Sequence, residues 1–389
     1  MPIINRVAEL ADEVAEWRRD FHANPEILYD VHRTAARVAE LLTSFGVDEV
    51  VTGIGRTGVV GVIRGREASG RTIGLRADMD ALPIQEVRDH PHRSTIDGAM
   101  HACGHDGHTA MLLGAARYLA ETRNFAGTAV VIFQPAEEGG AGGRAMVEDG
   151  MMERFGIDEV YGLHNMPGLP IGHVATRPGP VMAASNSFEI RLKGLGGHAA
   201  KPHMCIDPIV GGAQIVTALQ SIVARTIDPI DSAVVSVTRF HAGTSANNII
   251  PQTAVIGGTV RSLNEDTRHF LKQRFTEVVT GTAAAMGLEV ELDYEWGYPV
   301  VVNHAEQTEF AASVARSVAG ADKVSTEMPP TLGGEDFAYM LLARPGAFLF
   351  IGNGDSAGLH HPEYDFDDAL IPHGMSYWAK LVETALPVA

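Results

Sequence analysis

The spacing of apolar residues predicts helices in the first part of the chain. Residues 3–17 and 34–45 each carry apolar side chains at helical spacing, and Gly46 is typical of a helix end. Residues 109–119 predict a third helix. Short continuous apolar runs predict buried strands at residues 59–63, 72–75 and 129–133. Alternation of strands and helices indicates an α/β sheet with helices on both faces.

The pattern changes near residue 184 and predicts a second, inserted domain. Its elements follow the order β-α-β-β-α-β, which is typical of a ferredoxin-like split unit. They are strand 187–192, helix 207–225, strands 233–240 and 254–262, a helix capped by Asn264 that ends near residue 286, and strand 288–294. Longer α/β elements return after residue 300 and end in a helix over residues 373–386. We therefore expect an α/β protein of two domains: a mixed-sheet core from residues 1–184 and 296–389, and an inserted ferredoxin-like domain from residues 185–295.

Composition narrows the possible functions. The 389 residues exceed one ordinary hydrophobic core, which agrees with two domains. The 30 Lys and Arg residues against 48 Asp and Glu give a charge of −18, which argues against a nucleic-acid partner. No apolar stretch is long enough to span a bilayer, and no secretory signal is visible. The two cysteines cannot form a disulfide framework, so we expect a reducing, cytoplasmic location without a membrane partner.

Potential metal ligands are concentrated in short segments. Four histidine or cysteine residues lie within eight residues, with glycines between them. An acidic pair and a lone histidine each follow a predicted strand, where α/β folds bind their ligands. A further histidine pair lies near the C-terminus. These residues are His101, Cys103, His105, His108, Glu137, Glu138, His164, His360 and His361. Thiolate, imidazole and carboxylate groups favour zinc, while manganese and cobalt are also possible.

Each of these residues also has an ordinary structural interpretation. Cys103 could be a buried thiol, but in extended backbone it would point the same way as His105 and could share one metal centre with it. His108 could share a helical face with His105, but we expect it to begin the helix and to pack or hydrogen-bond. The density of potential ligands favours a metal site.

The paired glutamates Glu137 and Glu138 suggest hydrolysis. An acidic pair is usually only solvated, but two close carboxylates can divide the work: one binds metal and the other accepts a proton from water. Asp78, which follows a predicted strand, could hydrogen-bond a ligating imidazole and fix its tautomer, or could simply cap the strand. Together these residues predict a metal-dependent hydrolase.

Three residues of the predicted inserted domain could contact a substrate. His198 lies in a glycine-rich turn, and Asn248 and Arg261 would by default be loop and surface residues. The planar guanidinium of Arg261 could instead bind a carboxylate through two parallel hydrogen bonds.

The ordered set of motifs resembles a known family across essentially the whole chain. The motifs are residues 18–26, residues 75–83, the Cys103 and His105 cluster, the Glu137 and Glu138 pair, and residues 197–200, 333–337 and 359–362. They resemble metal-dependent amidohydrolases related to aminoacylase and carboxypeptidase G, in the branch with hippurate hydrolases, N-acyl-amino-acid amidohydrolases and auxin-conjugate hydrolases. Residues 27–31 depart from the Gly-Phe-Glu-Glu-like run of many relatives, which bears on substrate specificity.

The resemblance implies a two-metal site with a general base, Glu137. The implied ligands are Cys103, His105, Glu138, His164 and His360. The implied metals are zinc or manganese, with cobalt or nickel as further options. It also implies that the inserted domain is a lid and dimer interface in a homodimer or higher homo-oligomer. His198 would reach from the partner subunit and polarise the scissile carbonyl, while Asn248 and Arg261 would bind the substrate's carbonyl or carboxylate.

The implied reaction is hydrolysis of small N-acyl amino acids, such as hippurate-like or N-acetyl substrates, to a carboxylic acid and a free amino acid. A dipeptidase or an N-carbamoyl-amino-acid hydrolase would use the same metal centre. A non-catalytic metal-binding or peptide-binding protein is an alternative of a different class. Glu137 argues against that alternative, because a metal-storage site does not require a general base.

Overall fold

The computed structural model describes residues 3–389 and divides into two compact units. Of the described residues, unit 1 comprises 3–181, 302–329 and 336–389, and unit 2 comprises 182–301 and 330–335. Unit 2 is thus longer than the insertion expected over residues 185–295. One reason is that the backbone N–H of Ser185 donates to the carbonyl of Tyr298 at 3.0 Å, which attaches residues beyond 295 to this unit.

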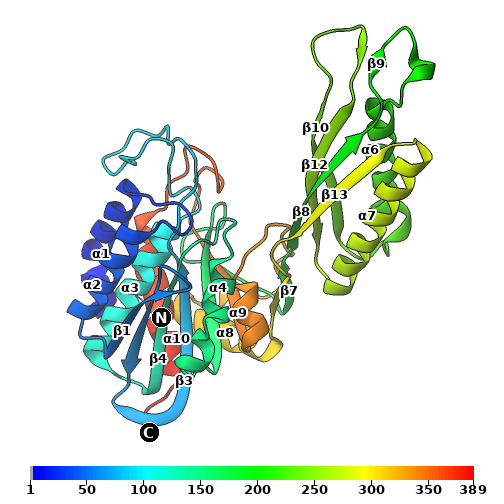
Figure 1. The fold of residues 1–389 in the computed structure, drawn as a ribbon. Coiled ribbons are helices and arrows are strands. Elements are labelled where there is room, and N and C mark those ends of the chain that lie inside the picture. The colour runs from blue at the N-terminus through cyan, green and yellow to red at the C-terminus, as the bar shows by residue number, and fades with distance from the viewer. Residues whose placement is uncertain (1–2) are drawn as a thin grey trace. The chain divides into compact units, whose positions relative to one another are not determined.

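Unit 1 is built on one mixed sheet of eight strands in the order β1-β2-β4-β3-β5-β16-β6-β15 (Figure 1). Neighbours among β3, β4, β5 and β16 are parallel, whereas β1 and β2 run antiparallel to their neighbours, so the predicted mixed sheet is confirmed. The strands are β1 (Glu49–Ile54), β2 (Gly58–Arg64), β3 (Glu67–Asp78), β4 (Ala126–Gln134), β5 (Glu159–Met166), β6 (Val174–Ala175), β15 (Val324–Ser325) and β16 (Gly346–Gly352).

Helices cover both faces of this sheet. Val130, Val131 and Ile132 of β4 are all fully buried although successive side chains point to opposite faces. Val131 belongs to the core cluster that also contains apolar residues of α1, α3 and α10. The helices of unit 1 are α1 (Asn5–Ala23), α2 (His32–Ser44), α3 (His105–Thr122), α4 (Gly142–Glu148), α5 (Met151–Arg154), α8 (Ala305–Ala319), α9 (Ala338–Ala343) and α10 (Ile371–Ala385).

The parallel strands bring the predicted catalytic segments to one edge of the sheet. Asp78 at the end of β3 pairs with Gln134 at the end of β4, and Arg76 pairs with Gly162 of β5. Two local expectations were wrong. Helix α3 begins at His105, four residues before the predicted start at residue 109, and His164 lies inside β5 rather than after it.

Unit 2 contains a four-stranded antiparallel sheet in the order β10-β12-β8-β13. Its main elements follow the predicted β-α-β-β-α-β order: β8 (Ala184–Lys193), α6 (Pro208–Thr226), β10 (Ala233–Ala242), β12 (Thr253–Ser262), α7 (Glu265–Ala285) and β13 (Glu289–Trp296). The predicted cap is confirmed, because the side chain of Asn264 accepts hydrogen bonds from the N–H groups of Asp266 and Thr267. Two short pairs of strands complete the fold: β9 (Gly197–His198) with β11 (Ile249–Ile250), and β7 (Gly179–Met182) with β14 (Val301–Asn303).

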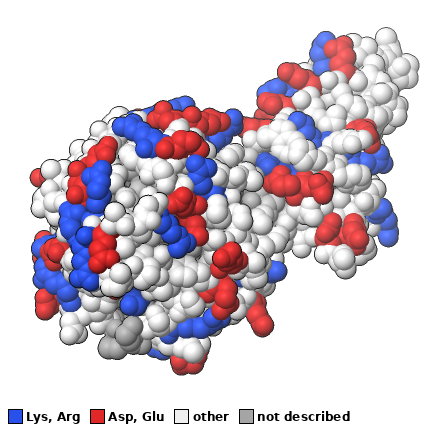
Figure 2. Space-filling model, turned by 90° about the horizontal axis from the view of Figure 1, so that it is seen from below, with Lys and Arg blue, Asp and Glu red and all other residues white. Residues whose placement is uncertain are grey.

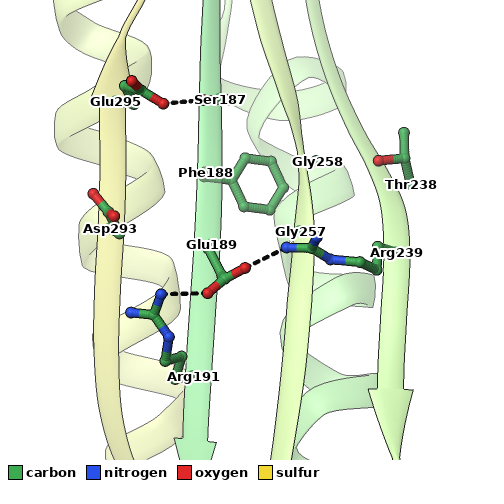
Figure 3. A pocket seen from close by; sticks show the side chains of 10 residues that line it. All are labelled: Ser187, Phe188, Glu189, Arg191, Thr238, Arg239, Gly257, Gly258, Asp293 and Glu295. Carbon is green, nitrogen blue, oxygen red and sulfur yellow. Dashed lines mark hydrogen bonds and ion pairs between the residues drawn. The ribbon is translucent and has the colours of Figure 1, made fainter.

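The two faces of the unit 2 sheet differ in chemistry. Phe188, Ile190 and Leu192 of β8 are buried in a core that includes apolar residues of α6 and α7. The alternate residues are polar, and on the opposite face Glu189 forms ion pairs with Arg191 and Arg239 around a shallow pocket (Figure 3). The helices therefore cover only one face of this sheet.

The surface drawn in Figure 2 carries charges of both signs. On the face drawn in Figure 2, basic and acidic side chains are interspersed, without a broad area of basic charge. Within residues 3–389, none of the helices is both long enough and apolar enough to cross a membrane.

Candidate metal centre

The predicted metal ligands converge in unit 1. Ligand atoms of Cys103, His105 and His164 all lie within 4.8 Å of one another. Ligand atoms of Cys103, Glu138 and His360 also lie within 4.8 Å of one another, so the two groups share the cysteine. The five predicted ligands therefore form one continuous cluster of donors, although they come from four separate segments of the chain.

The two buried imidazoles are oriented as metal ligands are. Nδ1 of His105 donates to the backbone carbonyl of Asp80 at 2.8 Å, and Nδ1 of His164 donates to the carbonyl of Asn165 at 2.7 Å. In the neutral form, each ring therefore keeps a lone pair on Nε2. Nε2 of His164 lies 3.4 Å from the Cys103 sulfur, and Nε2 of His105 is buried without a hydrogen-bond partner among residues 3–389. This donor set fits a divalent metal.

Glu138 and His360 lie close to each other and to Cys103. Nε2 of His360 lies 3.2 Å from Oε1 of Glu138, and the His360 side chain is 52% exposed. Nδ1 of the neighbouring His361 instead accepts a hydrogen bond from the Glu363 N–H at 3.1 Å. His360 is thus the histidine of this pair that belongs to the cluster.

The loop at Gly104 brings Cys103 and His105 together in a different way from that expected. The backbone is not extended there, because Gly104 has a φ of +90° and caps the start of α3. A Cβ atom at this position would lie 2.5 Å from Oδ1 of Asn165 and 2.6 Å from the Tyr364 hydroxyl. Only glycine fits this left-handed, close-packed position without strain.

A buried aspartate holds the two glutamates in place. Oδ1 of Asp80 accepts the N–H of Glu137 at 2.9 Å, and Oδ2 accepts the N–H of Glu138 at 3.1 Å. Ala136, just before the pair, is fully buried with a φ of +53°. Ligand atoms of Glu137, Glu138 and His105 lie within 4.8 Å of one another, so the predicted base borders the donor cluster.

Sequence reasoning did not single out Asp80. The signal was present, because this residue lies two positions beyond Asp78 in the same motif after β3. What the sequence could not show is that its carboxylate turns toward the segment after β4.

Asp78 does not make the hydrogen bond to a ligating imidazole that was expected of it. Its carboxylate binds Arg76 at 2.7 Å and Nδ1 of His108 at 2.6 Å, while Nε2 of His105 is 3.7 Å away. The Asp80 carbonyl orients His105 instead. His108 does not begin α3, which starts at His105, but it makes hydrogen bonds as expected, to Asp78 and Asn165.

Burial and nearby charges set the protonation of the donors. Burial lowers the pKa of His164 well below its usual range, so the imidazole is neutral and can donate its lone pair. Burial raises the pKa of the Cys103 thiol, and the nearby Glu138 carboxylate raises it further. A thiol in these surroundings forms a thiolate only when a positive charge is supplied, and binding a metal cation supplies it.

The predicted residues of unit 2 lie in two places. His198 in β9 pairs with Ile249, and Asn248 accepts the N–H of Ala199 at 3.0 Å, so His198 and Asn248 are neighbours on the surface. Arg261 lies near the other end of β12, eight residues beyond Thr253, which is about 26 Å along a strand. Arg261 is partly buried and makes no ion pair within residues 3–389.

Comparison with known proteins identifies the family. The model of peptidase family M20/M25/M40 matches residues 74–384. The chain belongs to this family. It is 42% identical to hippurate hydrolase of Campylobacter jejuni over 98% of both chains, and 40% identical to N-acetylcysteine deacetylase of Bacillus subtilis over 95% of this chain and 96% of that one. A solved structure from Bacillus subtilis, described as a dinuclear metal-binding peptidase of the M20 family, superposes with a TM-score of 0.84 at 35% identity and covers 98% of this chain and 100% of that chain.

These findings confirm the resemblance drawn from the motifs. This M20 protein is a metal-dependent hydrolase. Its donor cluster and its likeness to a dinuclear metal-binding peptidase support the presence of two divalent metal ions.

Proposed function

We propose that this M20 protein hydrolyses the amide bond of N-acyl amino acids and releases a carboxylic acid and a free amino acid. One observation carries the proposal: a buried carboxylate, Glu137, lies beside a second carboxylate, Glu138, and an imidazole nitrogen of His105 that makes no hydrogen bond within residues 3–389. A site that only stored metal would need no such extra carboxylate. The names of the hippurate hydrolase and N-acetylcysteine deacetylase relatives agree with this substrate class.

The donor set favours zinc or manganese in the two metal positions, with cobalt or nickel as alternatives. When bound, the metals lower the pKa of a water molecule and polarise the acyl carbonyl. Glu137 accepts the proton of the attacking water and then delivers it to the departing nitrogen. Both cysteines are unpaired, and a cytoplasmic location would keep the Cys103 ligand reduced.

His198 is suited to stabilise negative charge on the substrate's carbonyl oxygen. Its Nδ1 accepts the N–H of Ala200 at 3.1 Å, so the proton of the neutral ring is on Nε2. That N–H is exposed and available to donate. A donor of this kind is worth about 3–4 kcal/mol in the transition state. Asn248, next to His198, is proposed to bind the same carbonyl.

Arg261 is proposed to bind the substrate carboxylate through two parallel hydrogen bonds, which its lack of an ion pair allows. A small N-acyl amino acid cannot contact both Arg261 and His198 of one chain, because Arg261 lies about 26 Å along β12 from Thr253, which follows the β9-β11 pair that holds His198. We therefore propose a homodimer in which each substrate contacts Arg261 of one subunit and His198 of the other.

A substrate panel tests the function. Chelator-treated protein is assayed with benzoyl-, acetyl-, indoleacetyl- and carbamoyl-amino acids and with dipeptides, before and after addition of zinc or manganese. Metal-restored release of amino acids from the acyl substrates is expected. Preference for dipeptides or carbamoyl compounds would replace the proposal by one of those activities, and a lack of turnover with metal bound would support a non-catalytic protein.

Two variants separate the roles of base and ligand. Glu137→Ala is expected to abolish turnover while both metals remain bound, whereas Cys103→Ala is expected to lower metal occupancy. Glu16→Ala, which removes an exposed glutamate of α1, is the matched control and should retain activity and metal. Normal turnover by Glu137→Ala would show that another group is the base.

Subunit mixing tests the shared site. Glu137→Ala and His198→Ala are expected to be inactive alone. Mixed dimers, formed by dissociating and reassociating the two variants, should regain activity, because one of the two sites combines an intact Glu137 with an intact His198 of the partner subunit. A mixture that stays inactive although mixed dimers form would place both residues in the same subunit.

A further inference from the structure

A second cluster of metal-ligating side chains lies in unit 1, apart from the residues assigned to the metal centre. His22 is in the last turn of α1, Glu86 and His90 are in the irregular segment between β3 and α3, and Asp365 follows β16. Ligand atoms of His22, His90 and Asp365 all lie within 4.8 Å of one another, the same limit that the groups of the candidate metal centre satisfy. Oε1 of Glu86 lies 3.3 Å from Nε2 of His22 and 2.6 Å from Nε2 of His90.

The imidazole of His22 is held as a ligand would be. Its Nδ1 bonds Oδ2 of Asp106 at 2.8 Å, and both side chains are fully buried. A carboxylate that accepts from one ring nitrogen leaves the other nitrogen free to bind a metal, and metalloproteins commonly orient histidine ligands in this way. Nε2 of His22 accordingly points toward Glu86 and the rest of the cluster.

The imidazole of His90 has a nitrogen without a protein partner. Nε2 of His90 donates to Glu86, and Nδ1 is buried with no hydrogen bond to any of residues 3–389. The whole side chain is only 8% exposed. A buried nitrogen lone pair without a partner is costly, so this imidazole has acceptor capacity that the described residues leave unused.

Charge balance also points to a cation. The carboxylates of Glu86 and Asp106 are fully buried and that of Asp365 is 15% exposed, while Arg18 is the one fully buried guanidinium beside them in the described chain. At the rim, Arg88 lies 3.6 Å from Asp365 and is 47% exposed, so solvent screens its charge. The buried groups thus carry an excess of negative charge.

We propose that His22, His90 and Asp365, with Glu86 beside them, form a separate binding site for a divalent transition-metal ion. Imidazole and carboxylate donors favour zinc, copper or nickel over magnesium or calcium. Two zinc ligands lie at most about 4.2 Å apart, so small side-chain rotations bring these atoms into range. The ion is structural: it connects α1, the segment that leads to Cys103, and the segment that follows His360.

Metal stoichiometry tests the site. Metal-free protein is loaded with zinc, freed of excess by gel filtration and analysed for zinc per chain. The wild type is expected to retain one equivalent more than the two of the binuclear centre, and His90→Gln is expected to lose that equivalent. His32→Gln, which removes an exposed histidine at the start of α2, is the control and should bind like the wild type. Wild-type protein that stops at two equivalents, or a His90→Gln variant that keeps the extra one, would overturn the proposal.

The absorption spectrum of bound cobalt provides a readout that depends neither on the stability of His90→Gln nor on hydrolytic activity. Cobalt bound to Cys103 shows thiolate-to-metal charge transfer in the near ultraviolet, whereas cobalt bound by His22, His90 and Asp365 shows ligand-field bands alone. The extra wild-type equivalent should therefore add no charge-transfer absorption. It should remain bound in Cys103→Ala, which separates this site from the proposed hydrolytic centre. Loss of every cobalt equivalent on substitution of Cys103 would contradict a separate site.

Discussion

Replacement of Asp80 by asparagine tests whether this buried carboxylate positions the glutamate pair. Both of its oxygens are acceptors, since Oδ1 binds the N–H of Glu137 at 2.9 Å and Oδ2 binds the N–H of Glu138 at 3.1 Å. Asparagine keeps one oxygen and presents an NH₂ group to the other N–H. One hydrogen bond is therefore lost, and a backbone donor is left facing another donor in a buried site.

The magnitude follows from these contacts. A hydrogen bond to a charged group contributes about 1.5–3 kcal/mol, and an unsatisfied buried donor costs about 1–3 kcal/mol. Because these two quantities partly overlap, the free energy of unfolding of unit 1 should fall by about 3 kcal/mol, which corresponds to roughly 5–10 °C in the unfolding temperature. Displacement of Glu137 should lower kcat/KM by about 10–100-fold, as for other residues that orient a metal centre.

Calorimetry of metal-free protein measures the stability, and hydrolysis of benzoylglycine by zinc-loaded protein measures kcat/KM. Asp89→Asn makes the same chemical change at an exposed position and should leave both quantities unchanged. If Asp80→Asn matched this control in both measurements, the two hydrogen bonds would not be what holds Glu137 and Glu138 in place.

Three further predictions concern the metal loop, the substrate and the pH dependence. Gly104→Ala places a Cβ 2.5 Å from the side-chain oxygen of a neighbouring asparagine, in addition to about 1–2 kcal/mol of left-handed strain, so metal affinity in a chelator competition should fall at least about tenfold. Gly98→Ala has a similar positive φ but open space around it; equal effects of the two variants would show that the clash is irrelevant. Arg261→Lys should raise KM for N-acyl amino acids about 10–100-fold without changing the unfolding temperature, and an unchanged KM would exclude a paired contact with the carboxylate. Burial and the hydrogen-bonded Glu383 raise the pKa of Tyr118 from 10.0 to about 12. The stability from this group is therefore present below pH 10 and lost as the pH rises through 12. The difference in unfolding temperature between Tyr118→Phe and wild type should change across that window and stay constant below it.

Much of the fold follows from local sequence patterns. The apolar run at residues 129–133 is buried on both sides, and the structure extends it only to Ala126–Gln134. Asn264 caps α7 as predicted, because its side chain needs only the N–H groups of the next few residues. Short-range features of this kind depend on residue type and spacing, which are readable without a tertiary structure.

The composition of the candidate metal centre also follows from residue types. Cysteine, histidine and a glutamate pair after predicted strands favour a metal-dependent hydrolase wherever they come together. Their geometry does not follow in the same way: Gly104 is left-handed rather than extended, and His105 is oriented by the carbonyl of Asp80 rather than by Asp78. These contacts depend on which segments meet at the edge of the sheet.

Tertiary structure alone decided the long-range relations. His22, His90 and Asp365 come from segments far apart in the chain, and no spacing rule predicts that their ligand atoms lie within 4.8 Å of one another. The separation of His198 from Arg261 likewise emerges only when both are placed in unit 2, His198 in the β9-β11 pair and Arg261 near the far end of β12. The sequence by itself determined the elements, the donor chemistry and the family; the packing of distant segments decided which polar groups share a buried environment, because burial and proximity set their charge, their hydrogen bonds and their capacity to bind a metal.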